Sequence, residues 1–195
     1  MIAPETAHVA DAALIENSWS DPTEFAALYD RHAVAIHRYV ARRLGPAVAE
    51  DLVAETFLAA FRRRKRYDPA HADARPWLYG MAANLIGKHR RSEVRMLRAF
   101  ARTGHDSAAE GYADRVDDRV VAGALRRELA AALAQLSSGD RDVLLLVAWA
   151  DLSYEEVATA LRIPIGTVRS RLNRARRKTR AALATTSEEL SHERS

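Results

Sequence analysis

The segment over residues 151–180, DLSYEEVATALRIPIGTVRSRLNRARRKTR, constrains the fold more than any other part of the chain. It predicts a capped helix, a short turn and a second helix that is basic and carries no acidic residue over 165–180. At about 100° per residue, Val168, Leu172 and Ala175 share one side of that second helix. Because this apolar side is narrow, the helix must pack on a small partner helix and leave its cations facing outward, where a polyanion can bind.

The preceding helix supplies the expected partner surface. It begins with a capping box at Ser153 and Glu156, and its Val157, Ala158 and Leu161 should cover the apolar side of the basic helix. Short polar side chains near the start of the basic helix suit base edges, and the arginines beside them suit phosphates. The candidate DNA contacts are Thr167, Arg169, Ser170, Arg171, Asn173, Arg174 and Arg177. A solvated basic helix at the end of a bundle is the alternative, and the capped helix-turn-helix favours DNA binding.

Helical periodicity extends through most of the chain, and no sustained alternation of period two predicts a strand. Glycine and proline are few, with 8 and 6 residues among 195, while 48% of the residues are hydrophobic and 29% are charged. These proportions are typical of a soluble, helix-rich globular protein. We therefore predict an all-α fold of two small helical domains joined by an acidic linker.

Changes in composition set the expected boundaries. They predict a loose N-terminal arm over 1–20, a first helical domain over 21–99, an acidic linker over 100–119, a second helical domain over 120–184 and a tail over 185–195.

Three helices are expected in the first domain. The first begins at a capping box on Asp21 and Glu24, the second covers about 48–66, and the third covers about 76–98. A loop over 67–75 separates the last two. Although the net charge is only +4, cations gather at the end of the second and third helices, either as solvated runs or as contacts to a nucleic-acid backbone. The apolar stripe expected on the second helix comprises Leu52, Val53, Phe57, Leu58 and Phe61.

Several classes of function are disfavoured. The chain has no cysteine, which removes disulfides and thiolate chemistry and fits a reducing cytosol. The start carries no basic segment typical of a secretory signal, and the longest apolar run, over 143–150, is too short to span a bilayer. Its 7 histidines form no metal spacing, and neither a phosphate-binding glycine loop nor a nucleophile elbow is present. We expect no catalytic residues, no metal, no cofactor and no membrane insertion.

At this point three motifs become recognisable together. LSYEEVATALRIPIGTVRSRLNRARRK resembles region four of bacterial sigma factors of the extracytoplasmic-function group. AEDLVAETFLAAFRR resembles the core-polymerase-binding helix of sigma region two, and RPWLYGMAANLIGKHRR resembles the helix that reads the promoter −10 element. The matches follow the family order and cover about residues 25–180. The resemblance implies a cytoplasmic RNA polymerase sigma factor that directs promoter-specific transcription initiation.

The resemblance also implies roles for particular residues. Asp51 and Glu55 would face the clamp helices of the polymerase beta-prime subunit, although the residues alone favour a solvated helix face. The loop over 67–75 and the helix after it would hold the −10 element as a single strand, whereas the basic helix over 165–180 would read the −35 element. The −10 contacts would come from Asn84, Lys88, Arg91 and Tyr79. We expect Trp77 to belong to the core. Tyr79 is then the aromatic residue of this helix that is more available to contact a base. Members of this family usually pair with an anti-sigma factor, so the resemblance also implies an anti-sigma factor as a partner.

The chain departs from the family pattern at four positions. Ala54 stands where the family usually has Gln, and Lys88 where an acid is common. Arg162 takes the place of a frequent Gly in the turn, where a left-handed conformation costs about 1 kcal/mol relative to Gly. Asn173 replaces a frequent His and favours adenine.

Two other functions compete with the sigma factor. A stand-alone helix-turn-helix transcription regulator would use the basic helix but not the motifs around Asp51 and Trp77. An all-helical scaffold would leave the basic faces solvated.

Overall fold

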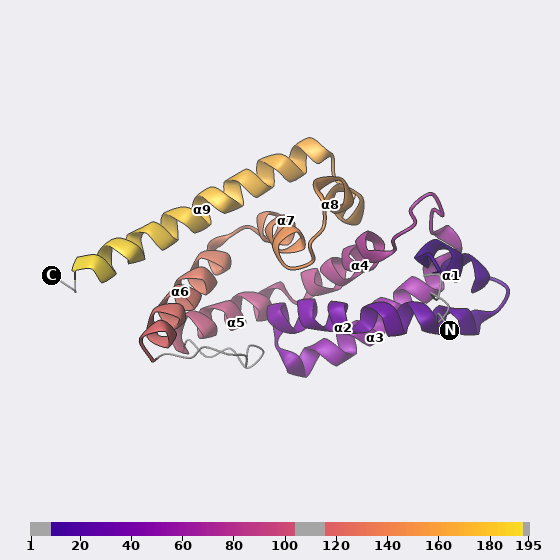
Figure 1. Ribbon diagram of the computed structural model, residues 1–195, viewed down its shortest axis with the longest axis horizontal. Helices are drawn as coiled ribbons and strands as arrows, with labels where there is room; N and C mark the ends of the chain where they lie inside the picture. The colour runs from indigo at the N-terminus through magenta and orange to yellow at the C-terminus, as the bar shows by residue number, and fades with distance from the viewer. Residues whose placement is uncertain (1–8, 104–115, 193–195) are drawn as a thin grey trace, which may run out of the picture.

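The computed structural model describes residues 9–103 and 116–192, and within these ranges it contains helices but no strand. The predicted all-α fold is confirmed. In chain order the elements are α1 (Asp11–Asn17), η1 (Pro22–Glu24), α2 (Phe25–Leu44), α3 (Pro46–Arg63), η2 (Arg64–Arg66), α4 (Arg75–Lys88), α5 (Arg90–Thr103), α6 (Val116–Gln135), α7 (Ser138–Ala148), α8 (Tyr154–Leu161) and α9 (Ile165–His192) (Figure 1). We refer to residues 9–103 as the first half and to 116–192 as the second half.

Local signals place several helix ends where the sequence predicts them. The capping box predicted at Asp21 and Glu24 forms only in part. The backbone N–H of Thr23 donates to Asp21 Oδ1 at 3.0 Å, but the N–H of Asp21 donates to the carbonyl of Asn17 and not to the side chain of Glu24. Both bonds of the other capping box form, because Ser153 N–H donates to Glu156 Oε2 at 2.7 Å and Glu156 N–H donates to Ser153 Oγ at 3.2 Å. The chain turns from α2 into α3 at Gly45, whose φ of 90° is a left-handed value that suits glycine.

The first half packs α2, α3 and α4 around one apolar core. Leu28, Ile36 and Val40 of α2 are buried against residues of α3 and α4, among them Leu78 and Ile86. The apolar pattern of α2 predicted these positions. On α3, Leu58 differs from the expectation, because it lies outside the core with 47% of its surface exposed.

Part of the arm predicted over 1–20 is helical, and residues 1–8 of that arm lie outside the described residues. Residues 11–17 form helix α1, and its Leu14 and Ile15 are buried against the first half. Asp11, at the first position of the helix, is also buried. Sequence periodicity missed this element because a helix of 7 residues is only two turns long.

The third expected helix is two helices. Helix α4 ends at Lys88, the backbone at His89 has φ −100° and ψ 19°, and α5 starts at Arg90. Gly87 immediately precedes the break and lowers helix propensity there. As a consequence Asn84 and Lys88 lie on α4, whereas Arg91 lies on α5.

The expected linker and tail are partly helical. Residues 100–103 belong to the end of α5, residues 116–119 begin α6, and α9 continues through the predicted tail as far as His192. The rest of the linker, over 104–115, lies outside the described residues. Helices α5 and α6 lie side by side where the halves meet, and α9 lies across α6, α7 and α8 (Figure 1).

The two halves also meet at α4 and α8. A Cβ on Gly80 would lie 3.1 Å from the Cα of Ala160 and closer still to its carbonyl oxygen. The backbones of α4 and α8 therefore touch, and only glycine fits at position 80.

Two glycines of α4 give a matched test of this contact. Gly87 has open space around it, so Gly87→Ala should raise the free energy of unfolding by about 0.5–1 kcal/mol through helix propensity. Gly80→Ala should instead lower it by about 1–3 kcal/mol and move α8 off α4. Urea unfolding and small-angle X-ray scattering measure the two effects. Equal stabilisation by both changes, without expansion of the molecule, would contradict the close contact.

Candidate nucleic-acid interface

Helix α9 presents a buried side and a cationic side, as its sequence predicts. Val168 and Ala175 are fully buried and Leu172 is 2% exposed, beside the buried Val157 and Ala160 of α8. The opposite surface is rich in exposed cations. They are Arg169, Arg174, Arg176, Arg177, Lys178 and Arg180. Seated on α7 and α8 in this way, α9 is a rigid, outward-facing basic helix.

The seven candidate contacts of α9 separate into two groups. Arg169, Ser170, Asn173 and Arg177 are exposed, and Thr167 is half-buried at the start of the helix. Arg174 is turned toward α7, where its Nε donates to the buried carboxylate of Asp140 at 3.1 Å. The half-buried Arg171 also lies against α7, with Nη1 only 2.7 Å from the place that a Cβ on Gly139 would take.

The turn of the helix-turn-helix keeps a left-handed residue without glycine. Arg162 follows α8 with φ 53° and ψ 48°, and the N–H of Ile163 donates to the carbonyl of Ala158 at 3.1 Å. Arg162 therefore adopts a left-handed conformation at the position where the family frequently has glycine. An L-residue in this conformation carries a steric cost that glycine does not.

Helix α4 exposes two of the three cationic or amide contacts predicted on it. Asn84 and Lys88 are exposed, and Lys88 Nζ donates to Glu55 Oε1 on α3 at 3.3 Å. Arg91 is exposed as well, but on α5 beyond the break at His89. The three side chains do not share one continuous helix face.

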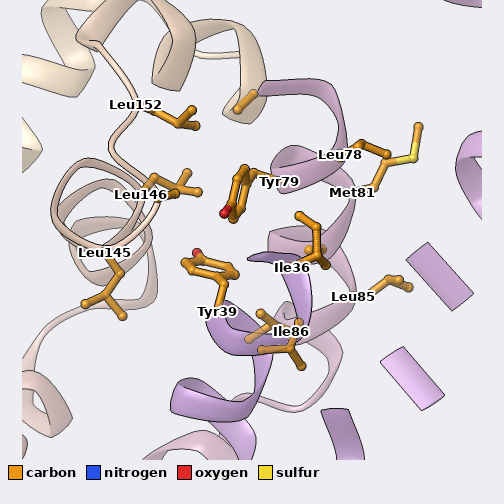
Figure 2. Packing of buried hydrophobic residues seen from close by; sticks show 14 of the residues in the cluster. Ile36, Tyr39, Leu78, Tyr79, Met81, Leu85, Ile86, Leu145, Leu146 and Leu152 are labelled. Atoms are coloured by element: carbon orange, nitrogen blue, oxygen red, sulfur yellow. The ribbon is translucent and has the colours of Figure 1, made fainter. Parts of the chain in front are cut away.

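The two aromatic residues of α4 differ from the expectation that Trp77 is the core residue and Tyr79 the accessible one. Tyr79 is 4% exposed and packs edge-to-face on Tyr39 at 5.2 Å, next to Leu146 of α7 (Figure 2). Burial raises the pKa of Tyr79 above its ordinary value. Trp77 is half-buried and lies 5.0 Å from the ring of Tyr67, beside the loop that leads into α4. Trp77, and not Tyr79, is thus the accessible aromatic, because α7 of the second half covers Tyr79.

A cleft of about 610 Å³ separates α4 and its preceding loop from α8. Arg63 and Arg66 stand on one wall, and Glu155 and Glu156 of α8 stand on the other. Asn84 also lines it. Both walls carry charges of both signs, because Asp68 and Asp73 also line the first and Arg162 the second, and Glu156 accepts from the N–H of Ser153.

Helix α3 carries an exposed acidic face. Asp51, Ala54, Glu55 and Leu58 recur at helical spacing and are all exposed. Leu58, which the sequence pattern predicts as a core residue, belongs to this face instead. An exposed large apolar side chain next to exposed carboxylates is a feature that a protein partner can cover.

A buried charge network joins the halves. The fully buried Arg43 of α2 donates through Nε to Glu93 Oε1 on α5 at 2.7 Å and through Nη2 to Asp142 Oδ1 on α7 at 2.6 Å. Arg141 of α7, also buried, donates to Glu93 Oε2 at 2.8 Å and to the carbonyls of Leu133 and Leu136 at the end of α6. No sequence signal identified this network, since its members lie 48 to 99 positions apart.

Burial and the neighbouring charges set the direction in which the pKa values of Arg43, Asp142 and Tyr39 shift. Burial alone would lower the pKa of Arg43, but Tyr39, Asp142 and Glu93 around it outweigh burial and raise that pKa. Burial raises the pKa of Asp142, against the opposing effect of Arg43. Burial likewise raises the pKa of Tyr39, whose hydroxyl accepts from Arg43, to about 12. Arg43 therefore stays charged at neutral pH.

Over the ranges 9–103 and 116–192, no cluster of His, Cys, Asp or Glu has the geometry of a metal site. Within the same ranges, no helix combines the length and the apolarity that crossing a bilayer requires.

Both halves match known sequence families. Residues 28–110 match the model of sigma-70 region 2, and residues 126–179 match that of sigma-70 region 4. The chain is 38% identical over 158 residues to the ECF RNA polymerase sigma factor SigL of Mycobacterium tuberculosis, covering 80% of this chain and 87% of SigL. A stand-alone regulator would have no use for region 2.

Solved structures share the fold. CnrH, solved in complex with the cytosolic domain of CnrY, aligns with a TM-score of 0.63 at 26% identity and covers 90% of this chain and 97% of CnrH. The sigma factor RpoE, solved with the anti-sigma factor NepR from Bartonella quintana, aligns with a TM-score of 0.57 at 22% identity, over 83% and 97% of the two chains.

The charge network predicts a large effect of one neutral substitution. Glu93→Gln keeps the shape of the side chain but leaves Arg141 without an ion-pair partner and Arg43 with Asp142 alone, so the free energy of unfolding should fall by about 3–5 kcal/mol. The exposed Glu50→Gln on α3 should change it by less than about 0.5 kcal/mol. Urea unfolding compares them, and similar midpoints would show that the network does not hold the halves together.

Proposed function

The chain belongs to the extracytoplasmic-function group of sigma-70 family RNA polymerase sigma factors, and on that basis we propose how its surfaces divide the work of promoter recognition. A sigma factor of this kind is a transcription initiation factor and not an enzyme. The observation that carries the proposal is the order of the two region matches on the two halves, with α9 of the second half presenting an exposed basic face.

We assign −35 recognition to the exposed face of α9. Thr167, Ser170 and Asn173 stand near its start, where short polar side chains reach base edges. Arg169 and Arg177 flank them at the distance suited to phosphates. Because Asp140 holds Arg174 and α7 borders Arg171, these two arginines orient α9 and contribute to DNA binding as backbone contacts.

We assign −10 recognition to the loop over 67–74 and to the exposed side of α4. Asn84 and Lys88 offer hydrogen bonds, and Arg91 adds a cation at the start of α5. Trp77 replaces the buried Tyr79 as the aromatic on which an unpaired base stacks. Because α8 touches α4 at Gly80, the halves must separate before a strand enters.

We assign core polymerase binding to the acidic face of α3, with Asp51, Glu55 and the exposed Leu58 toward the clamp helices of the beta-prime subunit. The partner of the protein away from polymerase would be an anti-sigma factor, by analogy with RpoE, which was solved bound to NepR. The proposed site of action is the cytoplasm. The domain division becomes region two over 11–99, a linker over 100–119, and region four over 120–184.

Run-off transcription tests the proposed function. Purified core polymerase should yield promoter-dependent transcripts from genomic fragments only when this protein is added. The pair Asp51→Ala and Glu55→Ala should abolish co-purification with core, whereas Glu24→Ala with Asp30→Ala removes two exposed acids elsewhere and should not. Core that neither binds the protein nor starts transcription from any fragment would refute the proposal.

Two substitutions on α9 separate base reading from backbone binding. Asn173→Ala should weaken binding by about 1–3 kcal/mol for the preferred −35 duplex alone and relax the preference at one position. Arg177→Ala should weaken binding to every sequence and reduce the slope of log affinity against log salt by about 1. Fluorescence anisotropy over a salt series measures both. Equal losses on all sequences for Asn173→Ala would make it a backbone contact.

A further inference from the structure

We propose that helix α1 braces the loop over 67–74 and that Asp11 is the residue that positions this loop to receive the −10 strand. The inference rests on the −10 role proposed above for the loop and α4. It concerns an N-terminal residue that lies far in sequence from the elements that would touch DNA.

Asp11 is 5% exposed and binds the end of the loop. Its Oδ2 accepts from the backbone N–H of Ala74 at 2.9 Å and lies 2.7 Å from Nε2 of His32, while Arg31 donates to Oδ1. Ala74 is the residue from which α4 starts, and no side chain of its own caps that helix. Asp73 Oδ1 accepts from the N–H of Arg75, the first residue of α4, at 2.8 Å, and Asp11 adds a second carboxylate at this helix N-terminus from 63 positions away.

The charged form of Asp11 is the one present at neutral pH. Burial on its own raises the pKa of this carboxyl, but the hydrogen bonds from His32 and Ala74 outweigh burial and lower it to about 2. The contact with the loop is therefore charge-assisted, which makes it stronger than a bond between neutral groups.

The residues that follow α1 bind η2, the short helix that leads into the loop. The indole N–H of Trp19, just beyond α1, donates to the carbonyl of Arg64 at 3.3 Å, and Arg64 Nε donates back to the carbonyl of Ser18 at 3.1 Å. Near Asp11, the N–H of Ala12 donates to the carbonyl of Ala72 at 3.4 Å. The segment over 11–19 is therefore attached to the end of the loop and to η2, the element that precedes the loop.

Between these attachments the loop is exposed. Asp68, His71 and Ala72 face solvent and line the cleft, while Tyr67 is buried and donates from its hydroxyl to the carbonyl of His71 at 2.5 Å. A loop whose ends are fixed loses less conformational freedom when a strand binds its exposed middle, so the strand binds more tightly and more selectively. Asp11 acts through the loop and is a positioning residue.

The test uses full-length protein assembled with core polymerase. A pool of templates carries one fixed −35 duplex and a randomised downstream element, and the transcribed sequences are read out. A second pool randomises the −35 element. Asp11→Asn removes the charge with little change of shape, Trp19→Phe removes the indole N–H at the other attachment, and Glu16→Gln removes an exposed charge from the same helix.

We expect Asp11→Asn to reduce enrichment of the downstream motif roughly tenfold and Trp19→Phe to reduce it less, while −35 enrichment and affinity for core stay at wild-type values. Glu16→Gln should behave as wild type. Unchanged downstream selection by Asp11→Asn and Trp19→Phe would overturn the inference alone. So would a parallel loss of downstream selection, −35 selection and core affinity, which indicates a general loss of structure. Wild-type protein that enriches no downstream motif would overturn the proposed function together with the inference.

Discussion

Two buried arginines share one carboxylate at the point where the halves of the chain meet. Glu93 accepts from Arg43 through one oxygen and from Arg141 through the other, and Arg141 also satisfies carbonyls at the end of α6. Helices α2, α5, α6 and α7 are thereby fixed around a single acid. The cost of removing these charges from water offsets most of their mutual attraction, so the network adds little net stability. Its side chains nevertheless satisfy one another in only one arrangement of the helices. The contact between the halves is therefore specific in its geometry, and the opening proposed above would break this network.

The closed arrangement leaves the two proposed DNA surfaces unequally available. The exposed cations of α9 lie on the side of the helix opposite its buried Val168, Leu172 and Ala175. The corresponding face of α4 meets the backbone of α8 at Gly80, and Tyr79 is covered by α7 (Figure 2). On the proposed roles, duplex can bind to the second half while the part of α4 around Tyr79 and Gly80 is still covered. Separation of the halves then exposes Tyr79, the network and the α8 wall of the cleft together.

Features that depend on neighbours along the chain were predictable from sequence. The apolar side of α9, the cap at Ser153 and the turn at Gly45 all follow from residues within about one or two helical turns, where periodicity and capping rules apply. Features that depend on distant neighbours were not. Leu58 has the same sequence signature as a core leucine, and only the absence of a covering helix makes it a surface residue. Asp11 appears as an ordinary polar residue until Ala74 and His32 are placed beside it.

The amino-acid sequence by itself determined the helical class, the order of the two family regions, and the basic face of α9. These features depend on the spacing of nearby residues and on the residues that make up each sequence motif. The tertiary structure decided which of the proposed contacts are accessible. It paired the exposed Arg174 with Asp140, buried Tyr79 while leaving Trp77 half-buried, and attached α1 to the loop before α4. These outcomes depend on how separate helices pack against one another, and burial and pairing across that distance leave no periodic signal in a single chain.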